Sequence, residues 1–298
     1  MRSIPLRINN VKNLTVIITG CGFKPIRHIY RYNGKPSHDI IPINGKSHKM
    51  NIGTASAYYL SKRGIPVIMV SRTPESLKKI KNGLVQLGCK KELISYVAAD
   101  MMTDFGIKKL IRQLPKGKIF YWLQSIGLSG GAYKIPHDNI YLPFEKIYPD
   151  IIKAELEIVI ATHRMMLQII HVFRRQVKHK QKAKIAIITS MSGERGYHFG
   201  ATHVAAKHAL VGYIRGVEKE LKDEGIEVFD IRAGGIDTGM YDNLYTRQAV
   251  EEISRRTKMW GGKKPIYAHP LQVAEKIYQA FFSRSPQKVY RILAPHQS

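Results

Sequence analysis

The sequence predicts an α/β fold of the doubly wound type, in which helices cover both faces of a parallel sheet. Short runs rich in β-branched residues predict strands at Thr15–Thr19, Val67–Val70, Ile94–Ala98, Ile119–Leu123, Ile185–Thr189, Glu227–Ile231 and Val289–Leu293. Apolar residues at helical spacing lie between them, at Ala55–Lys62, Glu75–Leu87, Phe105–Leu114, Ile151–Gln176, Ala205–Leu221 and Gln272–Phe282. Because the strand runs are apolar almost throughout, we expect both faces of the sheet to be buried, which is typical of parallel sheets.

Length and composition indicate one folded domain over residues 1–298. Of the 298 residues, 44% are hydrophobic and 23% are charged, so the chain has enough apolar material for a core. We find no linker, internal repeat, signal peptide or apolar run long enough to span a membrane. Two cysteines, Cys21 and Cys89, are too few for a disulfide framework. We therefore expect a cytoplasmic protein.

The first predicted strand ends in a glycine-rich turn. It reads Thr19-Gly20-Cys21-Gly22-Phe23, and Asn51-Ile52-Gly53 begins the next helix after a long detour. Glycines let the backbone approach a pyrophosphate, and a helix N-terminus offers free N–H groups to it. We predict that Gly20, Gly22, Asn51 and Ile52 bind a dinucleotide, although an ordinary structural turn is the alternative.

The end of the second predicted strand indicates which dinucleotide. Folds that bind NAD place an acidic residue there to hold the ribose hydroxyls, whereas a basic residue accommodates a 2′-phosphate. Here the residues are Ser71 and Arg72, and the acid is missing. The sequence therefore favours NADP(H).

The detour at residues 24–50 predicts a β-rich insertion. Asn33-Gly34 and Asn44-Gly45 are strong hairpin signals flanked by β-forming residues. Its charged residues are Lys24, Arg27, Arg31, Lys35, Lys46 and Lys49 against Asp39 alone. Because it interrupts the phosphate loop, we interpret it as a basic β-flap beside the mouth of the site. A surface insertion without a function is the alternative. In either case we expect that removing residues 24–50 leaves the fold intact.

These motifs together resemble the short-chain dehydrogenase/reductase superfamily, collinearly over roughly residues 14–293. The resemblance implies a seven-stranded Rossmann fold and further dinucleotide contacts. The residues expected to make these dinucleotide contacts are Asp100 and Met101 after the third strand, Ser125 and Gly127 after the fourth, and Gly234, Ile236 and Thr238 after the sixth. The sequence departs from the family at Asn51, where a glycine often stands, and at Ala233, where a proline is usual.

The resemblance also implies a catalytic set with substitutions. Ser190 lies where the family has its serine, and Lys207 where it has its lysine, which also binds the ribose. The tyrosine position is His203, and the family's asparagine would fall near Thr162-His163. His203 and Lys207 are four residues apart on one helix, so they share a face. Three hypotheses stay open: proton exchange by His203, a replacement donor such as Tyr197, and loss of hydride transfer.

The predicted activity is NADP(H)-dependent reduction of a carbonyl, or the reverse oxidation of an alcohol. An acyl-chain or ketide-like substrate is suggested by family analogy alone. Tyr197, Met240, Tyr241 and Trp260 are candidates to line its pocket, which helices at Tyr241–Lys258 and Pro270–Phe282 would cover. The alternative is a non-redox protein on the same fold, either lyase-like or NADP-sensing. The resemblance further suggests a homodimer or homotetramer through the helices at 151–176 and 203–221.

The net charge of +26 would attract polyanions. We find no nucleic-acid-binding module in the sequence, so we do not expect nucleic acid as a partner. A generally lysine-rich surface is the simpler interpretation. The chain has 12 histidines. His163, His171, His198, His203 and His208 show no ligand spacing with neighbouring carboxylates, so we expect no metal site.

Overall fold

A seven-stranded parallel sheet forms the centre of the computed structural model, which describes residues 13–127, 141–257 and 264–294. The strands are β1 (Leu14–Thr19), β7 (Val67–Ser71), β8 (Ile94–Ala98), β9 (Ile119–Gln124), β10 (Ala183–Ser190), β11 (Ile226–Ala233) and β12 (Val289–Ile292). Their order is β12-β11-β10-β9-β1-β7-β8. The predicted fold class is confirmed. The order reverses at β1, with β7 on one side and β9 on the other, which opens a crevice at the carboxyl ends of these strands.

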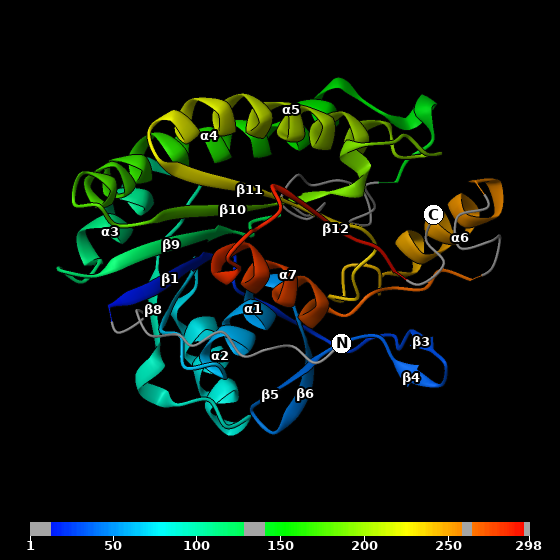
Figure 1. Ribbon diagram of the computed structural model, residues 1–298. Helices are drawn as coiled ribbons and strands as arrows, with labels where there is room; N and C mark the ends of the chain where they lie inside the picture. The colour runs from blue at the N-terminus through cyan, green and yellow to red at the C-terminus, as the bar shows by residue number, and fades with distance from the viewer. Residues whose placement is uncertain (1–12, 128–140, 258–263, 295–298) are drawn as a thin grey trace.

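Two helical layers cover the sheet (Figure 1). One layer consists of α1 (Ile52–Ser61), α2 (Pro74–Gln86) and α7 (Pro270–Phe282), and the other of α3 (Asp104–Gln113), α4 (Pro149–Lys178) and α5 (Ala201–Asp223). α6 (Leu244–Thr257) lies beyond the carboxyl edge of the sheet. The prediction that the helix at Pro270–Phe282 covers the pocket is wrong. Its apolar side chains Val273, Ile277 and Phe281 are buried against α1 and the sheet. A helix with a wide apolar face is stable only when that face packs into the hydrophobic core.

α4 is long and apolar enough to cross a membrane by length and composition alone, and it is the one such helix in the described ranges. It belongs to the layer over the sheet, however. Met165, Ile169 and Phe173 are fully buried in the core on that face. Packing within the domain thus explains the apolar residues on the inner face of α4.

The insertion forms two small antiparallel sheets. β2 (Phe23–Pro25), β6 (Lys46–Met50) and β5 (Ile40–Ile43) make one, and β3 (Arg31–Tyr32) pairs with β4 (Lys35–Pro36) in the other. Both predicted Asn-Gly turns are present, since Asn33, Gly34, Asn44 and Gly45 all have positive φ. In Figure 1 the β5–β6 pair lies beside α2, whereas the β3–β4 hairpin projects from the body of the molecule.

The insertion is integrated into the core. Ile41, Ile43 and Met50 are buried in the same hydrophobic cluster as α1, α2 and α7. A Cβ on Gly83 of α2 would lie 2.5 Å from the carbonyl oxygen of Pro42, so the two elements are in close contact. The expectation that the insertion could be removed without damage to the fold is therefore wrong, because its loss would expose this apolar surface to water.

The sequence context of Lys49 suggested a surface cation of the insertion, and this expectation is also wrong. Its side chain is fully buried, and Nζ donates to Asp237 Oδ1 at 2.7 Å and to Asp242 Oδ1 at 2.8 Å. Ser37 Oγ also donates to Asp237, at 3.1 Å. Both carboxylates follow β11, so the insertion is fixed to the loop in which dinucleotide contacts are predicted. A buried lysine requires such partners.

Candidate functional site

A cleft of about 560 Å³ opens at the carboxyl ends of β1, β7, β8 and β9. Eight of the residues predicted to bind the dinucleotide line it: Gly20, Asn51, Ser71, Arg72, Asp100, Met101, Ser125 and Gly127. Cys21 also lines the cleft, and burial raises the pKa of its thiol to about 12, so it is not a nucleophile at neutral pH.

The floor of this cleft requires glycine at two positions. Gly20 has φ +92°, and a Cβ there would lie 2.7 Å from the backbone of Ser125. A Cβ on Gly53, at the start of α1, would lie 2.7 Å from Ser125 Oγ and 2.8 Å from the Gly20 carbonyl oxygen. The β1 turn, α1 and the end of β9 therefore approach each other closely. This is the geometry that lets a pyrophosphate contact the backbone.

Asn51 joins the two halves of the phosphate loop across the insertion. Its Oδ1 accepts from the backbone N–H groups of Thr54, at 2.9 Å, and Gly22, at 3.1 Å. Its Nδ2 donates to the Gly20 carbonyl at 2.7 Å. The side chain thus caps α1 and replaces contacts that a continuous loop would make with itself. The amides of Ile52 and Gly53, in the first turn of α1, have no intrahelical acceptor and are the donors that the helix end offers to an anion.

The opposite end of the cleft is basic at the position predicted from sequence. Arg72 is exposed just after β7, and no ion pair engages it among the described residues. Asp100 Oδ1 accepts from the Met102 N–H at 3.0 Å, which fixes the turn after β8. The glycine floor, the free amides of α1 and this arginine together suit a long, phosphorylated ligand.

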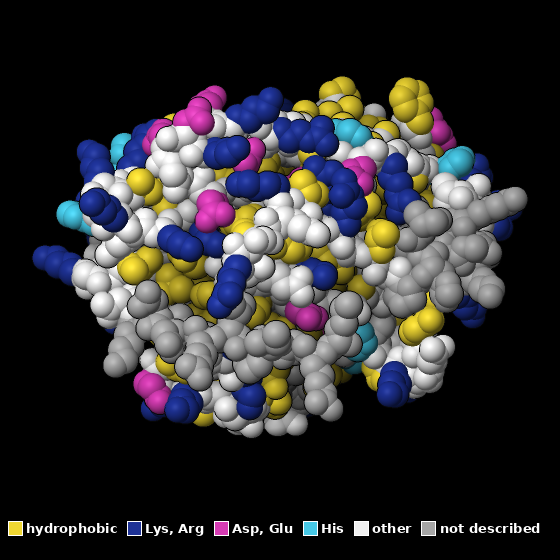
Figure 2. Space-filling view, viewed as in Figure 1, with side chains coloured by type: hydrophobic (Ala, Val, Ile, Leu, Met, Phe, Trp, Pro, Cys, Tyr) yellow, Lys and Arg dark blue, Asp and Glu magenta, His cyan; other side chains and the backbone are white. Residues whose placement is uncertain are grey.

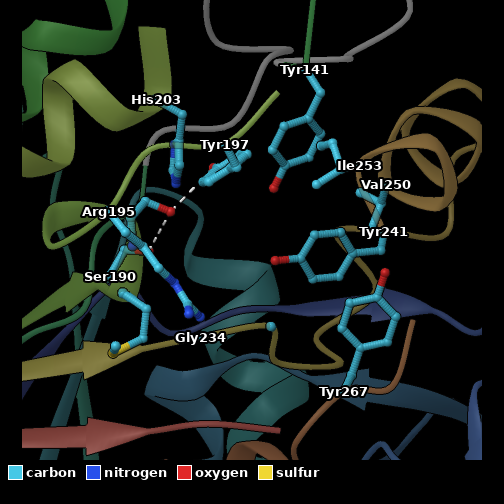
Figure 3. Close-up of a pocket in the computed structure, with 13 residues that line it drawn as sticks. Tyr141, Ser190, Arg195, Tyr197, His203, Gly234, Tyr241, Val250, Ile253 and Tyr267 are labelled. Atoms are coloured by element: carbon cyan, nitrogen blue, oxygen red, sulfur yellow. Dashed lines mark hydrogen bonds between the residues drawn. The ribbon is translucent and has the colours of Figure 1, made fainter. Parts of the chain in front are cut away.

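A second, smaller cavity of about 60 Å³ lies beside the ends of β10 and β11 (Figure 3). Ser190, His203, Tyr197, Tyr241 and Gly234 line it, as predicted for catalytic, substrate and cofactor contacts. Its further lining residues, which the sequence did not single out, are Tyr141, Met191, Ser192, Arg195, Gly235, Val250, Ile253 and Tyr267. The four tyrosines surround the cavity from separate segments in Figure 3.

A chain of hydroxyl groups runs along one wall of this cavity. Ser190 Oγ donates to Ser192 Oγ at 3.0 Å, and Ser192 Oγ lies 3.1 Å from Tyr197 Oη. Burial raises the pKa of the Tyr197 hydroxyl, which therefore stays protonated across the ordinary pH range. Tyr197 can donate or accept a hydrogen bond here, but it is harder to ionise than a solvent-exposed phenol.

His203 and Lys207 lie one turn apart in the N-terminal half of α5, with the carboxylate of Glu155 beside them. His203 Nδ1 is 3.5 Å from Glu155 Oε2, and both side chains are largely buried. Burial lowers the pKa of His203 further than Glu155 raises it, so the imidazole is neutral at pH 7. Burial also lowers the pKa of Lys207, and the Glu155 carboxylate opposes that shift.

Other predicted site residues have different surroundings. Lys207 follows His203 by one turn of α5 and lines neither this cavity nor the cleft. Met240 packs against the tyrosine cluster, while Ile236 pairs with Ala268 and accepts from the Thr238 N–H. Trp260 is outside the described residues.

The position expected for the family's asparagine does not face the pair. Thr162 accepts a hydrogen bond from Gln124 at 3.2 Å, and His163 contacts Tyr213 at 3.0 Å on an exposed surface. The α4 residue beside His203 is Glu155, which sequence reasoning missed. A signal was available, because Glu155 occupies the apolar face of α4 in helical register with Ile158 and Thr162. A lone carboxylate on a buried face indicates a specific partner.

Comparisons with known proteins agree with this geometry. A family model described as short chain dehydrogenase matches residues 47–249, beginning within β6. Short-chain dehydrogenase reductase 4 of Arabidopsis thaliana is 30% identical over 120 residues, which cover 40% of this chain and only 39% of that relative.

Two solved structures share the fold. That of 3-ketoacyl-(acyl-carrier-protein) reductase from Brucella melitensis, complexed with NADH, has a TM-score of 0.67 at 15% identity and matches 94% of this chain and 96% of its own. That of an alcohol dehydrogenase from the archaeon Thermococcus sibiricus, complexed with 5-hydroxy-NADP, has a TM-score of 0.63 at 17% identity and matches 96% and 98%. At these identities the likeness establishes the fold alone.

Proposed function

Because the chain belongs to the short-chain dehydrogenase family, we propose that it is an NADP(H)-dependent oxidoreductase that interconverts an alcohol and a carbonyl, with His203 and Lys207 as its catalytic pair. The observation that carries this proposal is the position of His203. It lies one turn before Lys207 and lines a cavity with Ser190 and Gly234, next to the cleft at the ends of β1, β7, β8 and β9. The alternative, a non-redox protein that binds the dinucleotide, would keep the cleft and lack the chemistry.

The bound dinucleotide would supply or accept a hydride, and the chain's own residues would manage the proton and the charge. His203 exchanges a proton with the substrate oxygen, while Ser190 donates a hydrogen bond to it. Lys207 contributes positive charge behind the histidine and, by the family resemblance, binds the ribose. The Asn51-capped end of α1 would hold the pyrophosphate.

Arg72 is the proposed discriminator between the two nicotinamide cofactors. Arg72→Ala should weaken NADPH binding by about tenfold or more and leave NADH binding nearly unchanged, because a charge-assisted contact to the 2′-phosphate is lost. Titration of both reduced cofactors into the variant and the wild type measures this difference. Lys78→Ala, a charge change on exposed α2 away from the cleft, is the control. Equal losses for both cofactors would remove Arg72 from this role.

The basic surface suits an anionic ligand without specifying nucleic acid. Figure 2 shows lysine and arginine side chains dispersed over this face among carboxylates and apolar patches, and they form no single stripe. A dispersed positive field raises the local concentration of phosphorylated cofactors and substrates.

The outward face of α4 favours self-association. Ile160 and Leu167 are about half exposed there, at 51% and 55%. Both lie on one face of α4, and a contiguous apolar face can mark a site of association. We expect a homodimer or homotetramer through α4 and α5, which light scattering on the purified protein would test.

A cofactor-binding assay joined to a turnover assay tests the proposed function. NADPH should bind with micromolar affinity or better, and a panel of carbonyls and alcohols (short aliphatic, aromatic, hydroxyacyl and steroid) should include at least one that changes the absorbance of reduced nicotinamide. Tight binding without turnover across the panel would favour the non-redox alternative. Failure to bind either nicotinamide cofactor would contradict both.

A further inference from the structure

Glu155 is a buried carboxylate next to the proposed proton exchanger. Only 4% of the residue is exposed. Oε2 lies 3.5 Å from His203 Nδ1, and in the described part of the chain neither His203 Nδ1 nor Glu155 Oε1 has a hydrogen-bond partner. A buried carboxylate without compensation is strongly destabilising, so its retention here requires a favourable interaction with the imidazole and the nearby Lys207.

The pairing determines which imidazole nitrogen carries the proton. A carboxylate oxygen accepts hydrogen bonds, so Nδ1 can interact favourably with Glu155 Oε2 only as Nδ1–H. In a neutral imidazole the other nitrogen, Nε2, is then an acceptor. Figure 3 shows the His203 ring directed from α5 toward the cavity. A lone pair on Nε2 is therefore available to take a proton from a group bound in that cavity.

We propose that Glu155 is a positioning residue that holds His203 in the Nδ1–H tautomer, so that Nε2 is the nitrogen that exchanges a proton with the substrate oxygen. This inference rests on the proposed function and names the residue that orients its proton exchanger.

The step balances as follows. The substrate O–H bond breaks, and its proton goes to His203 Nε2. The carbinol C–H bond breaks, and a bound oxidised nicotinamide would accept its hydride as the two-electron oxidant. The C–O bond becomes a carbonyl, and the imidazolium formed is stabilised by the Glu155 carboxylate until the proton passes to water.

The groups that face His203 explain why base catalysis dominates near pH 7. Glu155 on α4 favours the imidazolium, whereas Lys207 on α5 and burial disfavour it. The ring centroids of Tyr141 and His203 are 6.4 Å apart. Tyr197 and Arg195 line the same cavity. Because the net effect lowers the pKa of His203, the histidine is a neutral base at pH 7. Alcohol oxidation should rise with pH through this pKa, whereas carbonyl reduction, which needs the imidazolium, should fall.

Long-range ¹H–¹⁵N NMR of the imidazole groups tests the tautomer without cofactor or turnover. His203 signals are assigned by their loss in His203→Phe, since the chain has 12 histidines. In the wild type at neutral pH, His203 should be the Nδ1–H tautomer. In Glu155→Gln the tautomer should become mixed and the His203 pKa should fall further, because the charge that favoured the imidazolium is gone. Glu155→Asp, which keeps the charge, should restore the preference.

Kinetics supply the second readout. Glu155→Gln should lower kcat for alcohol oxidation by about 10²-fold or more, within the range known for carboxylate-oriented histidines, with a smaller effect on KM. Glu220→Gln, an exposed change on α5, is the matched control and should have no effect. An Nε2–H tautomer in the wild-type spectrum would overturn the inference, even if Glu155→Gln does not fold. Since that spectrum requires no turnover, its outcome is independent of whether His203→Phe confirms the proposed function.

Discussion

Replacing His203 with phenylalanine is expected to lower kcat by about 10²–10⁴-fold and to leave NADPH affinity close to the wild-type value. The substitution removes the proton exchanger and keeps an aromatic ring in the cavity, whereas the cofactor cleft is lined by other residues. Lys207→Ala should behave differently. It should weaken NADPH binding and lower kcat together, because one ammonium is proposed to serve both cofactor binding and the electrostatics behind the histidine.

Stopped-flow turnover and cofactor titration on the two variants separate these outcomes. Tyr197→Phe is the matched control, because it removes the other hydroxyl proposed as a proton donor and keeps the ring. If His203→Phe turns over at the wild-type rate and Tyr197→Phe does not, the proton exchanger is Tyr197 and His203 is a bystander. His203→Tyr restores the family's phenol, but the longer ring must fit a cavity shaped around imidazole.

Lys49→Met is expected to lower the free energy of unfolding by about 3–5 kcal/mol. The methionine fills a similar volume but leaves Asp237 and Asp242 buried without their shared cation. Urea denaturation followed by far-UV circular dichroism measures this change. Lys46→Met, on the exposed part of β6, is the matched control and should change stability by less than about 0.5 kcal/mol.

A triple variant separates charge from packing at this site. Lys49→Met with Asp237→Asn and Asp242→Asn removes all three charges, so it should recover a large part of the stability lost in Lys49→Met. A loss of less than about 1 kcal/mol in the free energy of unfolding of Lys49→Met would contradict the structural role of the Lys49 ion pairs with Asp237 and Asp242. It would also mean that these ion pairs contribute little to the attachment of the insertion to the loop after β11.

The sheet could be predicted from sequence because its strands are nearly uniform apolar runs. Ile94–Ala98 agrees residue for residue with β8, and the helix predicted from Pro270 ends at Phe282 as α7 does. Element ends elsewhere differ by a few residues, where capping decides the boundary. The position of α7 could not be predicted, because an amphipathic pattern gives the face that is buried and not the surface that buries it.

The cofactor cleft could also be predicted from the sequence, because its residues follow strand ends that a parallel sheet brings to one edge. The partners of Glu155 and Lys49 could not be predicted. They lie far along the chain, His203 for Glu155 and Asp237 and Asp242 for Lys49. The place of Glu155 on the apolar face of α4 indicates burial but not the partner, and the local pattern around Lys49 predicts a solvated surface.

Transfer of deuterium tests the central claim of hydride exchange dependent on His203. The wild type is incubated with NADP⁺ and secondary alcohols deuterated at the carbinol carbon, drawn from the same four chemical classes, and the recovered nucleotide is analysed by mass spectrometry. We predict deuterium in the reduced nicotinamide for at least one alcohol, and its loss in His203→Phe under conditions where both proteins bind NADPH equally well. Tight NADP(H) binding with no label transferred from any alcohol, and none from deuterated NADPH to the matching carbonyls, would contradict the account.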